Sequence, residues 1–164
     1  MPLGVERKIM KYFLDTEFIE YPCSIDLISI GMKCEDDRKF YAISTDFDSS
    51  KASEWVKENV ISILPEPELC NLWMPKGQIT TKVLHFIGDD IPEFWGYFSG
   101  YDWVVFCWLF GTMMNLPKGW PMYCHDLKQL SDDIGKPDFP SPEGEHDALV
   151  DACWNEKFYQ YLKA

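Results

Sequence analysis

Residues 11–19 read Lys-Tyr-Phe-Leu-Asp-Thr-Glu-Phe-Ile, an apolar and aromatic stretch that two carboxylates interrupt. Its apolar content predicts a buried strand near the start of a domain. Because a strand points residues i and i+2 to the same face, Asp15 and Glu17 should project side by side. Two anions in an apolar setting are costly unless positive charge compensates, and no Lys or Arg lies between Lys11 and Lys33. We therefore expect a divalent metal here, since hard cations such as Mg²⁺ bind carboxylate oxygens.

The chain as a whole is acidic, with a formal net charge of −12 at pH 7. Such a protein is not the usual nucleic-acid binder, because phosphate groups are bound by Lys and Arg. There are two explanations. Either metals bound to a cluster of carboxylates allow an anionic substrate to bind, or the acidic protein mimics DNA and binds basic partners. A mimic would carry exposed acidic stripes, whereas Asp15 and Glu17 lie within an apolar stretch. A further alternative is that Thr16 faces the core and both acids are solvated on an outer face.

Length and composition indicate one folded domain over residues 1–164, with a motif-bearing core of about residues 8–162. The 164 residues are 46% hydrophobic and 16% aromatic, which suits one sizeable core. No apolar run approaches the ~20 residues of a membrane helix, and the first ten residues do not resemble a signal peptide. The six cysteines are scattered without a CxxC pair, which favours reduced thiols. We expect a cytoplasmic protein that does not bind membranes.

Periodicity and turn signals predict a mixed α/β fold. Strands are expected at residues 7–18, 25–33, 39–44, 93–99 and 122–124, the first three as an antiparallel meander. Helices are expected at residues 50–63, 80–87, 101–114, 126–134 and 145–162. The order of these elements predicts a mixed β-sheet of about five strands flanked by helices.

Acids at two further positions stand next to apolar segments. Asp102 follows a strand at the start of an apolar helix, where capping the helix is the alternative role. Asp151 lies in the closing helix, and His146 should precede it on the loop or first turn, because a fully helical His146 would not share its face. An exposed loop histidine is the alternative for His146. The rival bases are His85, expected as a packed helix side chain, and His125, expected in a structural or second polar site.

In this order the acids and the histidine resemble the motifs of the DEDDh (DnaQ-like) 3′–5′ exonucleases. Those motifs are D-x-E on the first strand, a middle Asp, and H-x(4)-D near the C-terminus, here Asp15-Thr16-Glu17, Asp102 and His146–Asp151. Leu-Asp-Thr-Glu-Phe-Ile at 14–19, Leu-Ile-Ser-Ile-Gly at 27–31 and His-Asp-Ala-Leu-Val-Asp-Ala at 146–152 are closer still to one compact branch. That branch is the small bacterial and phage 3′–5′ exoribonucleases first described in mycobacteria. The resemblance covers about residues 11–162 and implies an RNase H-like fold. It departs in the middle motif, where residues 97–101 lack the Asn of many relatives.

The resemblance implies a site with two Mg²⁺ or Mn²⁺ ions and a general base. Asp15, Glu17 and Asp151 would hold one ion, and Asp15 would bridge to a second that Asp102 supports. His146 would take the proton from the attacking water, since imidazole titrates near neutral pH. Four carboxylates and two divalent cations are formally neutral, which partly accounts for the acidity.

The resemblance also suggests the substrate. Phe18 and Ile19 directly follow Glu17, so they could bind the terminal base and ribose, although core packing is the alternative for Phe18. The chain has only two arginines, which argues against a long duplex groove. We expect hydrolysis of single-stranded RNA from its 3′ end with release of nucleoside 5′-monophosphates, and relatives suggest a homodimer. The alternatives are a 3′–5′ exonuclease that prefers single-stranded DNA, and a catalytically idle acidic binding protein on the same fold.

Overall fold

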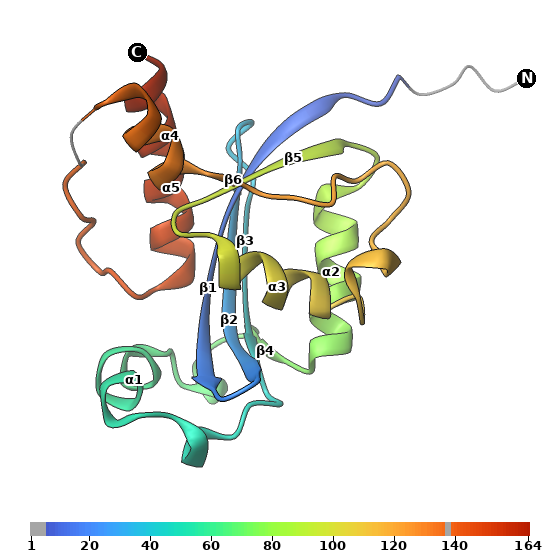
Figure 1. Cartoon of the computed structure of the whole chain (residues 1–164). Helices are drawn as coiled ribbons and strands as arrows, with labels where there is room; N and C mark the ends of the chain where they lie inside the picture. Colours follow the sequence, from blue (N-terminus) through green and yellow to red (C-terminus); the bar gives the residue numbers. More distant parts are fainter. Residues whose placement is uncertain (1–5, 137–138) are drawn as a thin grey trace, which may run out of the picture.

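A computed structural model describes residues 6–136 and 139–164 of the chain. Its sheet has six strands in the order β4-β3-β2-β1-β5-β6 (Figure 1). The strands are β1 (Ile9–Tyr21), β2 (Ser24–Cys34), β3 (Lys39–Ser44), β4 (Trp73–Met74), β5 (Ile91–Gly96) and β6 (His125–Asp126). β1, β2 and β3 form the expected antiparallel meander, whereas β5 runs parallel to β1 and β6 parallel to β5.

Helices cover both faces of this sheet, as expected for a mixed α/β fold. They are α1 (Glu54–Asn59), α2 (Lys76–Ile87), α3 (Gly100–Trp108), α4 (Leu127–Ile134) and α5 (Ala148–Lys163), with short 3₁₀ turns between several of them. α2 and α3 lie on one face, and α5 lies on the other with α4 beside it (Figure 1). None of the helices within residues 6–136 and 139–164 is long and apolar enough to cross a membrane.

The alternation of β1 decides where its acids point. Tyr12 packs in the apolar cluster under α2 and α3, whereas Phe13 packs with Phe158 of α5 on the opposite face. Because side chains two apart share a face, Asp15 and Glu17 continue the row of Phe13 toward α5. The N-terminal strand therefore carries both acids to the covered α5 side of the sheet.

The structure differs from the expected elements in three places. The sixth strand, β4, was not expected, because two residues are too short to give a periodic pattern. The strand expected at 122–124 is instead β6, His125–Asp126, where the His125 ring stacks on Trp95 of β5 at 4.4 Å. The helix expected over 50–63 is broken into a 3₁₀ turn, α1 and a second 3₁₀ turn, because Ser53 caps α1 by accepting a hydrogen bond from the Val56 N–H.

Other boundaries move by a few residues because local turns end or start the elements. β5 ends at Gly96 and not at residue 99, since Phe98 has a left-handed backbone with φ of 50°. α3 ends at Trp108 and not at residue 114, while α2 starts at Lys76, four residues earlier than expected. α5 starts at Ala148 and not at residue 145, because the residue before it is the helix cap.

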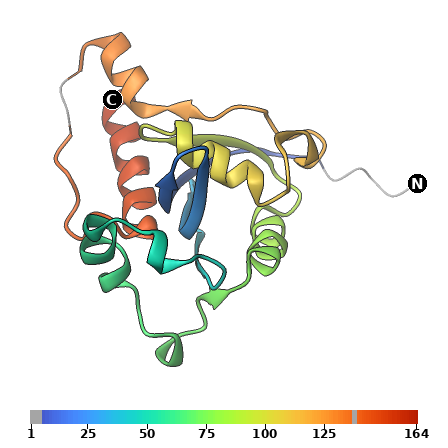
Figure 2. The ribbon, with the colours of Figure 1, turned by 60° about the horizontal axis from the view of Figure 1, so that its bottom comes forward.

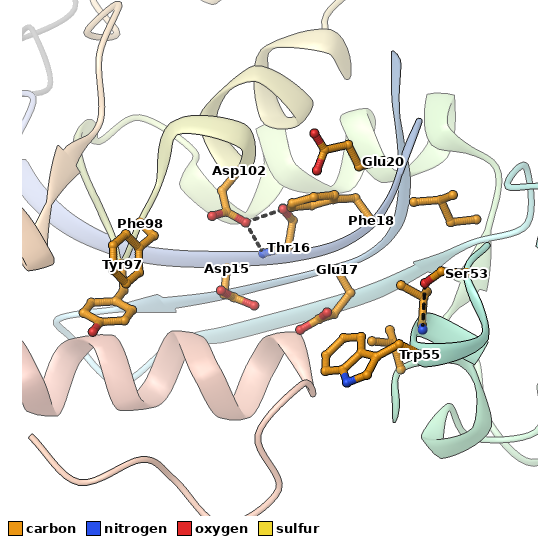
Figure 3. Close-up of a pocket in the computed structure, with 13 residues that line it drawn as sticks. Asp15, Thr16, Glu17, Phe18, Glu20, Ser53, Trp55, Tyr97, Phe98 and Asp102 are labelled. Atoms are coloured by element: carbon orange, nitrogen blue, oxygen red, sulfur yellow. Dashed lines mark hydrogen bonds between the residues drawn. The ribbon is translucent and has the colours of Figure 1, made fainter. Parts of the chain in front are cut away.

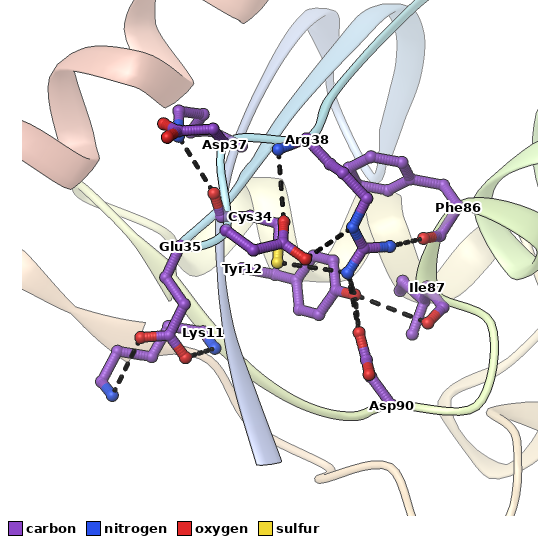
Figure 4. Close-up of polar contacts among 11 residues, drawn as sticks. Lys11, Tyr12, Cys34, Glu35, Asp37, Arg38, Phe86, Ile87 and Asp90 are labelled. Carbon is purple, nitrogen blue, oxygen red and sulfur yellow. Dashed lines mark hydrogen bonds and ion pairs between the residues drawn. The ribbon is translucent and has the colours of Figure 1, made fainter. Parts of the chain in front are cut away.

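A polar network fixes α2 on the sheet face away from Asp15 (Figure 4). The Arg38 guanidinium pairs with the Asp90 carboxylate at 2.8 Å and donates to the Phe86 carbonyl at the end of α2. The Tyr12 hydroxyl also donates to Asp90. These contacts join β1, the β2–β3 turn and the α2–β5 connection, so we assign them a structural role.

Candidate active site

The edge of β1 becomes free where β5 leaves the sheet. The last β1–β5 pair is Phe13 with Trp95, and α3 begins four residues after β5 ends. Beyond that point the Thr16 N–H donates to Asp102 Oδ1 at 2.9 Å, and the Thr16 hydroxyl donates to the same oxygen (Figure 3). Asp102 is therefore held beside the D-x-E segment with only 6% exposure. The helix-cap alternative for Asp102 is wrong, because the N-cap residue of α3 is Ser99.

Asp15 is not solvated on an outer face. Asp15 Oδ2 is buried without a hydrogen-bond partner among the described residues, so the solvated alternative is wrong for this acid. The pairing with β2 shifts register between Glu17 and Phe18, and this irregularity skips Ile28. Such bulges re-aim neighbouring side chains and recur next to active sites.

α5 packs closely on the sheet, and this positions Asp151, the acid in the first turn of the helix. Asp147 caps the helix by accepting hydrogen bonds from two N–H groups of that turn. A Cβ at Gly31 would lie 2.2 Å from the Ala148 carbonyl oxygen, so only glycine permits this approach of α5 to β2. Asn155 then donates to the Leu14 carbonyl oxygen on β1 at 3.0 Å. The helix is thus fixed at its start and one turn beyond Asp151.

His146 lies just before α5, as expected, and is half-buried. Its backbone is left-handed, with φ of 74°, and its N–H donates to Asp151 Oδ2 at 2.9 Å. The segment that carries α1 approaches this end of α5 (Figure 2), and the Trp55 and His146 rings meet edge to face at 4.9 Å. Glu17, His146 and Asp151 each offer a ligand atom within 4.8 Å of the others. His146 is therefore not an isolated loop histidine.

The two rival histidines have other surroundings. His85 is exposed on α2, so the expectation that it is a packed side chain is wrong. His125 lies between Trp95 and Tyr123, in stacked and edge-to-face contact respectively. Its neighbour Asp126 caps α4, which supports the structural alternative for this pair.

Burial raises the pKa values of all four acids, and nearby carboxylates add to the effect. Burial, then the charges of Asp102 and Glu17, hold the pKa of Asp15 well above its usual range. Burial and then the Asp151 charge raise the pKa of Glu17 to about 8. Burial raises the pKa of Asp102 to about 6 despite the hydrogen bonds from Thr16, and that of Asp151 to about 6 despite the His146 N–H. A cation among these acids would offset the repulsion.

Two neighbouring cavities meet at the acids. The first, of about 450 Å³, runs along β1 past Phe18 to Trp55 of α1 (Figure 3). The second, of about 470 Å³, is lined by His146 and Asp151 on the α5 side. Both are lined by Asp15, Glu17, Tyr97 and Phe98. Volumes of this size suit small ligands or parts of larger ones.

The residues expected to bind substrate differ in how accessible they are. Phe18 lines the first cavity and also packs against the apolar cluster under α3, so both of its expected roles are compatible with the structure. Ile19 borders the cavity but is only 1% exposed, in a separate cluster with Ile28 and Val60. Ile19 therefore shapes the wall more than it offers contact area.

Three aromatic residues around the cavities were not among the predicted site residues. Trp55 lies within the helix expected at residues 50–63, yet it is 53% exposed and lines the first cavity. Tyr97 and Phe98 counted as strand residues, yet they follow β5 in a turn beside Asp15. The sequence offered two signals for these residues. Trp55 follows the Ser53 helix cap by two residues, and Tyr97 and Phe98 shortly precede Asp102.

The raised pKa values predict how the stability of the metal-free protein depends on pH. Between about pH 4 and pH 8 the folded acids bind protons more tightly than the unfolded chain, so the free energy of unfolding falls as pH rises. With EDTA, we expect a melting temperature roughly 3–6 °C lower at about pH 8 than at about pH 5.5, from on the order of 1–2 kcal/mol. Adding Mn²⁺ should remove most of that loss by mass action. A melting temperature that responds to neither pH nor Mn²⁺ would contradict the site.

Comparisons with known proteins agree with this architecture. The crystal structure of cell-death related nuclease 4 (CRN-4) aligns with a TM-score of 0.54 at 9% identity, covering 94% of this chain. The chain spans 63% of that structure, and the likeness shows a shared fold and nothing more.

Sequence comparison is more specific. A family model described as the 3′-5′ exoribonuclease Rv2179c-like domain matches residues 10–163. Two Mycobacterium tuberculosis proteins, named 3′-5′ exoribonuclease Rv2179c (strain H37Rv) and 3′-5′ exoribonuclease MT2234.1 (strain CDC 1551), are each 44% identical over 147 residues. Each alignment covers 87% of this chain and 87% of the relative. The chain belongs to the Rv2179c-like family, which confirms the branch that its motifs indicated.

Proposed function

We propose that this protein is a divalent-metal-dependent 3′–5′ exoribonuclease that acts on single-stranded RNA and releases nucleoside 5′-monophosphates. Family membership and the names of the two mycobacterial relatives support the exoribonuclease activity. The observation that carries the metal-dependent chemistry is Asp15 Oδ2, which is buried near three further acids and has no hydrogen-bond partner in the described part of the chain. The same proposal includes a homodimer and a cytoplasmic location.

The residues present fit the expected cations. A hard cation would bind the buried Oδ2 of Asp15 and would lower the raised pKa values of the neighbouring carboxylates. Asp15, Glu17 and Asp151 would hold one Mg²⁺ or Mn²⁺, and Asp15 and Asp102 would hold a second. When bound, the cations offset phosphate charge and favour ionisation of the attacking water.

The side chains around the acids have separate tasks in the proposed reaction. His146 accepts the proton of the attacking water, from a loop position that its N–H bond to Asp151 fixes. Thr16 keeps Asp102 directed at the edge of β1 through two hydrogen bonds. Phe18 forms part of the wall against which the terminal base packs, and Trp55 closes the far end of that cavity. The terminal phosphodiester is thus placed against the acids.

The proposed preference for RNA over DNA predicts a difference in rate between the two substrates. A ribose 2′-OH against β1 could donate to Glu17 or to nearby backbone, a contact that deoxyribose cannot make. In a gel time course with 5′-labelled RNA and DNA of one sequence, we expect RNA to shorten stepwise from its 3′ end, about tenfold faster than DNA or more. RNA with a blocked 3′ end should stay intact.

The outcomes of this assay separate the alternatives. Equal or faster degradation of DNA would favour the exodeoxyribonuclease while keeping the exonuclease. Internal cleavage of the blocked strand would overturn the exonuclease itself. No hydrolysis of either strand with Mn²⁺ or Mg²⁺ would favour an idle acidic binding protein.

A further inference from the structure

Lys39 and Lys157 line a groove beside the active site, the lysine groove. Its volume is about 580 Å³, and its walls are the start of β3, one side of α5 and part of the loop before α5. Phe139, Pro142 and Trp154 line both this groove and the second cavity of the active site. The groove therefore adjoins the second cavity at the loop before α5.

The two lysines of the groove carry charge that no acid balances. Both are exposed, and neither forms an ion pair within residues 6–136 and 139–164. Lys33, which lies opposite Lys39 in the β2–β3 register, pairs with Asp37 at 2.8 Å and with Glu156 at 3.1 Å. Because Lys33 is only 4% exposed, these two acids compensate a buried charge. Lys39 and Lys157 are left to interact with a ligand.

Unpaired cations in one groove are unusual in a chain with a net charge of −12. Other cations of the chain pair with acids, among them Arg38, Lys57, Lys76 and Lys128. Glu143 also lines the lysine groove, so two lysines there face one acid. The groove is thus a positively charged surface next to an acidic active site, and its charge suits an anionic ligand.

A strand of RNA bound at the active site has to continue past the acids. The proposed reaction packs the terminal base along Phe18 in the first cavity, so the rest of the strand leaves on the other side. One adjoining hollow, which begins at Phe98, is lined by Asp126, Asp132 and Asp133, and its Lys128 pairs with Asp132 at 2.6 Å. Phosphates would be repelled there, whereas the lysine groove attracts them.

We propose that the RNA leaves the active site over the loop before α5, and that Lys39 and Lys157 bind phosphates upstream of the scissile bond. This inference rests on the proposed function. The loop is fixed to α5 at this point, because Trp154 Nε1 donates to the Pro140 carbonyl at 2.6 Å. Lysine ammonium groups bind phosphates as point charges, so this contact is independent of the base sequence.

The test compares two lengths of RNA, because only a strand with several phosphates reaches the groove. A dinucleotide without a 5′ phosphate has one phosphate, which the proposed reaction places at the acids. An RNA of about ten nucleotides with the same 3′ end also has upstream phosphates. The variants are Lys39→Gln, Lys157→Gln and the double variant. The control is Lys82→Gln, which removes an exposed lysine from α2 on the other face of the sheet (Figure 1).

The double variant should raise KM for the longer RNA about fivefold to tenfold relative to KM for the dinucleotide, with kcat within about twofold. This is the size expected of two exposed charge pairs. The slope of log KM against log salt concentration at constant Mn²⁺ should fall by about 1.4, since each phosphate contact on a single strand contributes about 0.7. Each single variant should show about half of these changes in log units. Lys82→Gln should behave like the wild type.

Several results would overturn the lysine groove as a phosphate site. One is an unchanged KM and salt slope for the longer RNA in the double variant. Another is an equal loss with the dinucleotide, which would mean that the lysines act on the fold or on the active site. An equal loss in Lys82→Gln would mean that only the overall charge matters. In each case a wild type that hydrolyses both RNAs leaves the proposed function standing, whereas a wild type inactive on both removes the function and the groove together.

Discussion

Replacing Asp15 by Asn is expected to reduce hydrolysis of single-stranded RNA on the order of 10³-fold or more. Asp15 is the acid assigned to both cations, and its Oδ2 is buried without a hydrogen-bond partner among the described residues. Cations stabilise the charge that develops on the phosphate by several kcal/mol, and about 4 kcal/mol corresponds to about 10³-fold in rate. Calorimetry should show that the variant binds Mn²⁺ more weakly, because an amide replaces the Asp15 carboxylate.

The stability of the same variant separates loss of function from loss of fold. Burial and neighbouring acids raise the pKa of Asp15, so the ionised side chain destabilises the metal-free fold. Asp15→Asn should therefore melt at the same or a higher temperature than the wild type in EDTA at about pH 8. Asp89→Asn, at an exposed position after α2, is the matched control and should keep activity and Mn²⁺ binding. Unchanged Mn²⁺ affinity in Asp15→Asn would rule out its role as a ligand.

Local sequence patterns predicted the parts of the fold whose cause is local. The alternation of β1 was enough to put Asp15 and Glu17 on one face, since period two is a property of any strand. The helical period of the closing segment was enough to place His146 on the loop or first turn, since a fully helical His146 would not share the face of Asp151. These features depend on neighbours within a few residues, and the structure contains them.

Features that depend on distant contacts could not be read in the same way. Asp102 resembled a helix cap, because nothing in its own segment reveals that Thr16, 86 residues away, would donate to it. Trp55 lies within a segment expected as one helix, and its contact with His146 depends on where α1 packs. Gly31 drew attention only as part of a motif, although its missing side chain lets α5 approach.

The family resemblance supplied what the residues alone left open. Asp15 and Glu17 could have been a solvated pair, and Asp102 a cap, until the order of all five motif residues was considered together. The structure brings these residues around two adjoining cavities, which a motif does not describe. Phe98, which lines both cavities, lies in a turn whose N–H groups donate to Asp126.

The second large effect is expected for His146. As the proton acceptor it should contribute a factor on the order of 10²–10⁴ to kcat, so His146→Ala should lower turnover by that amount. Because the backbone there is left-handed, His146→Asn is the companion variant, since Asn adopts that conformation more readily than Ala. His85→Ala, at an exposed position of α2, is the control and should leave turnover unchanged.

The Mn²⁺ affinity of the His146 variants decides whether His146 is a base or a metal ligand. This test is needed because a ring nitrogen of His146 lies within 4.8 Å of a carboxylate oxygen of Glu17 and of Asp151. The bond to Asp151 comes from the backbone N–H, so both variants keep it and the carboxylate should stay in place. A base therefore predicts Mn²⁺ affinity within about twofold of the wild type, whereas a ligand predicts a loss on the order of tenfold or more. Rate profiles at saturating Mn²⁺ add a second criterion, because the acids also bind protons as pH falls. If His146 is the base, the wild type loses rate in acid more steeply than His146→Asn, and parallel profiles with weakened Mn²⁺ binding would assign the ring to the metal.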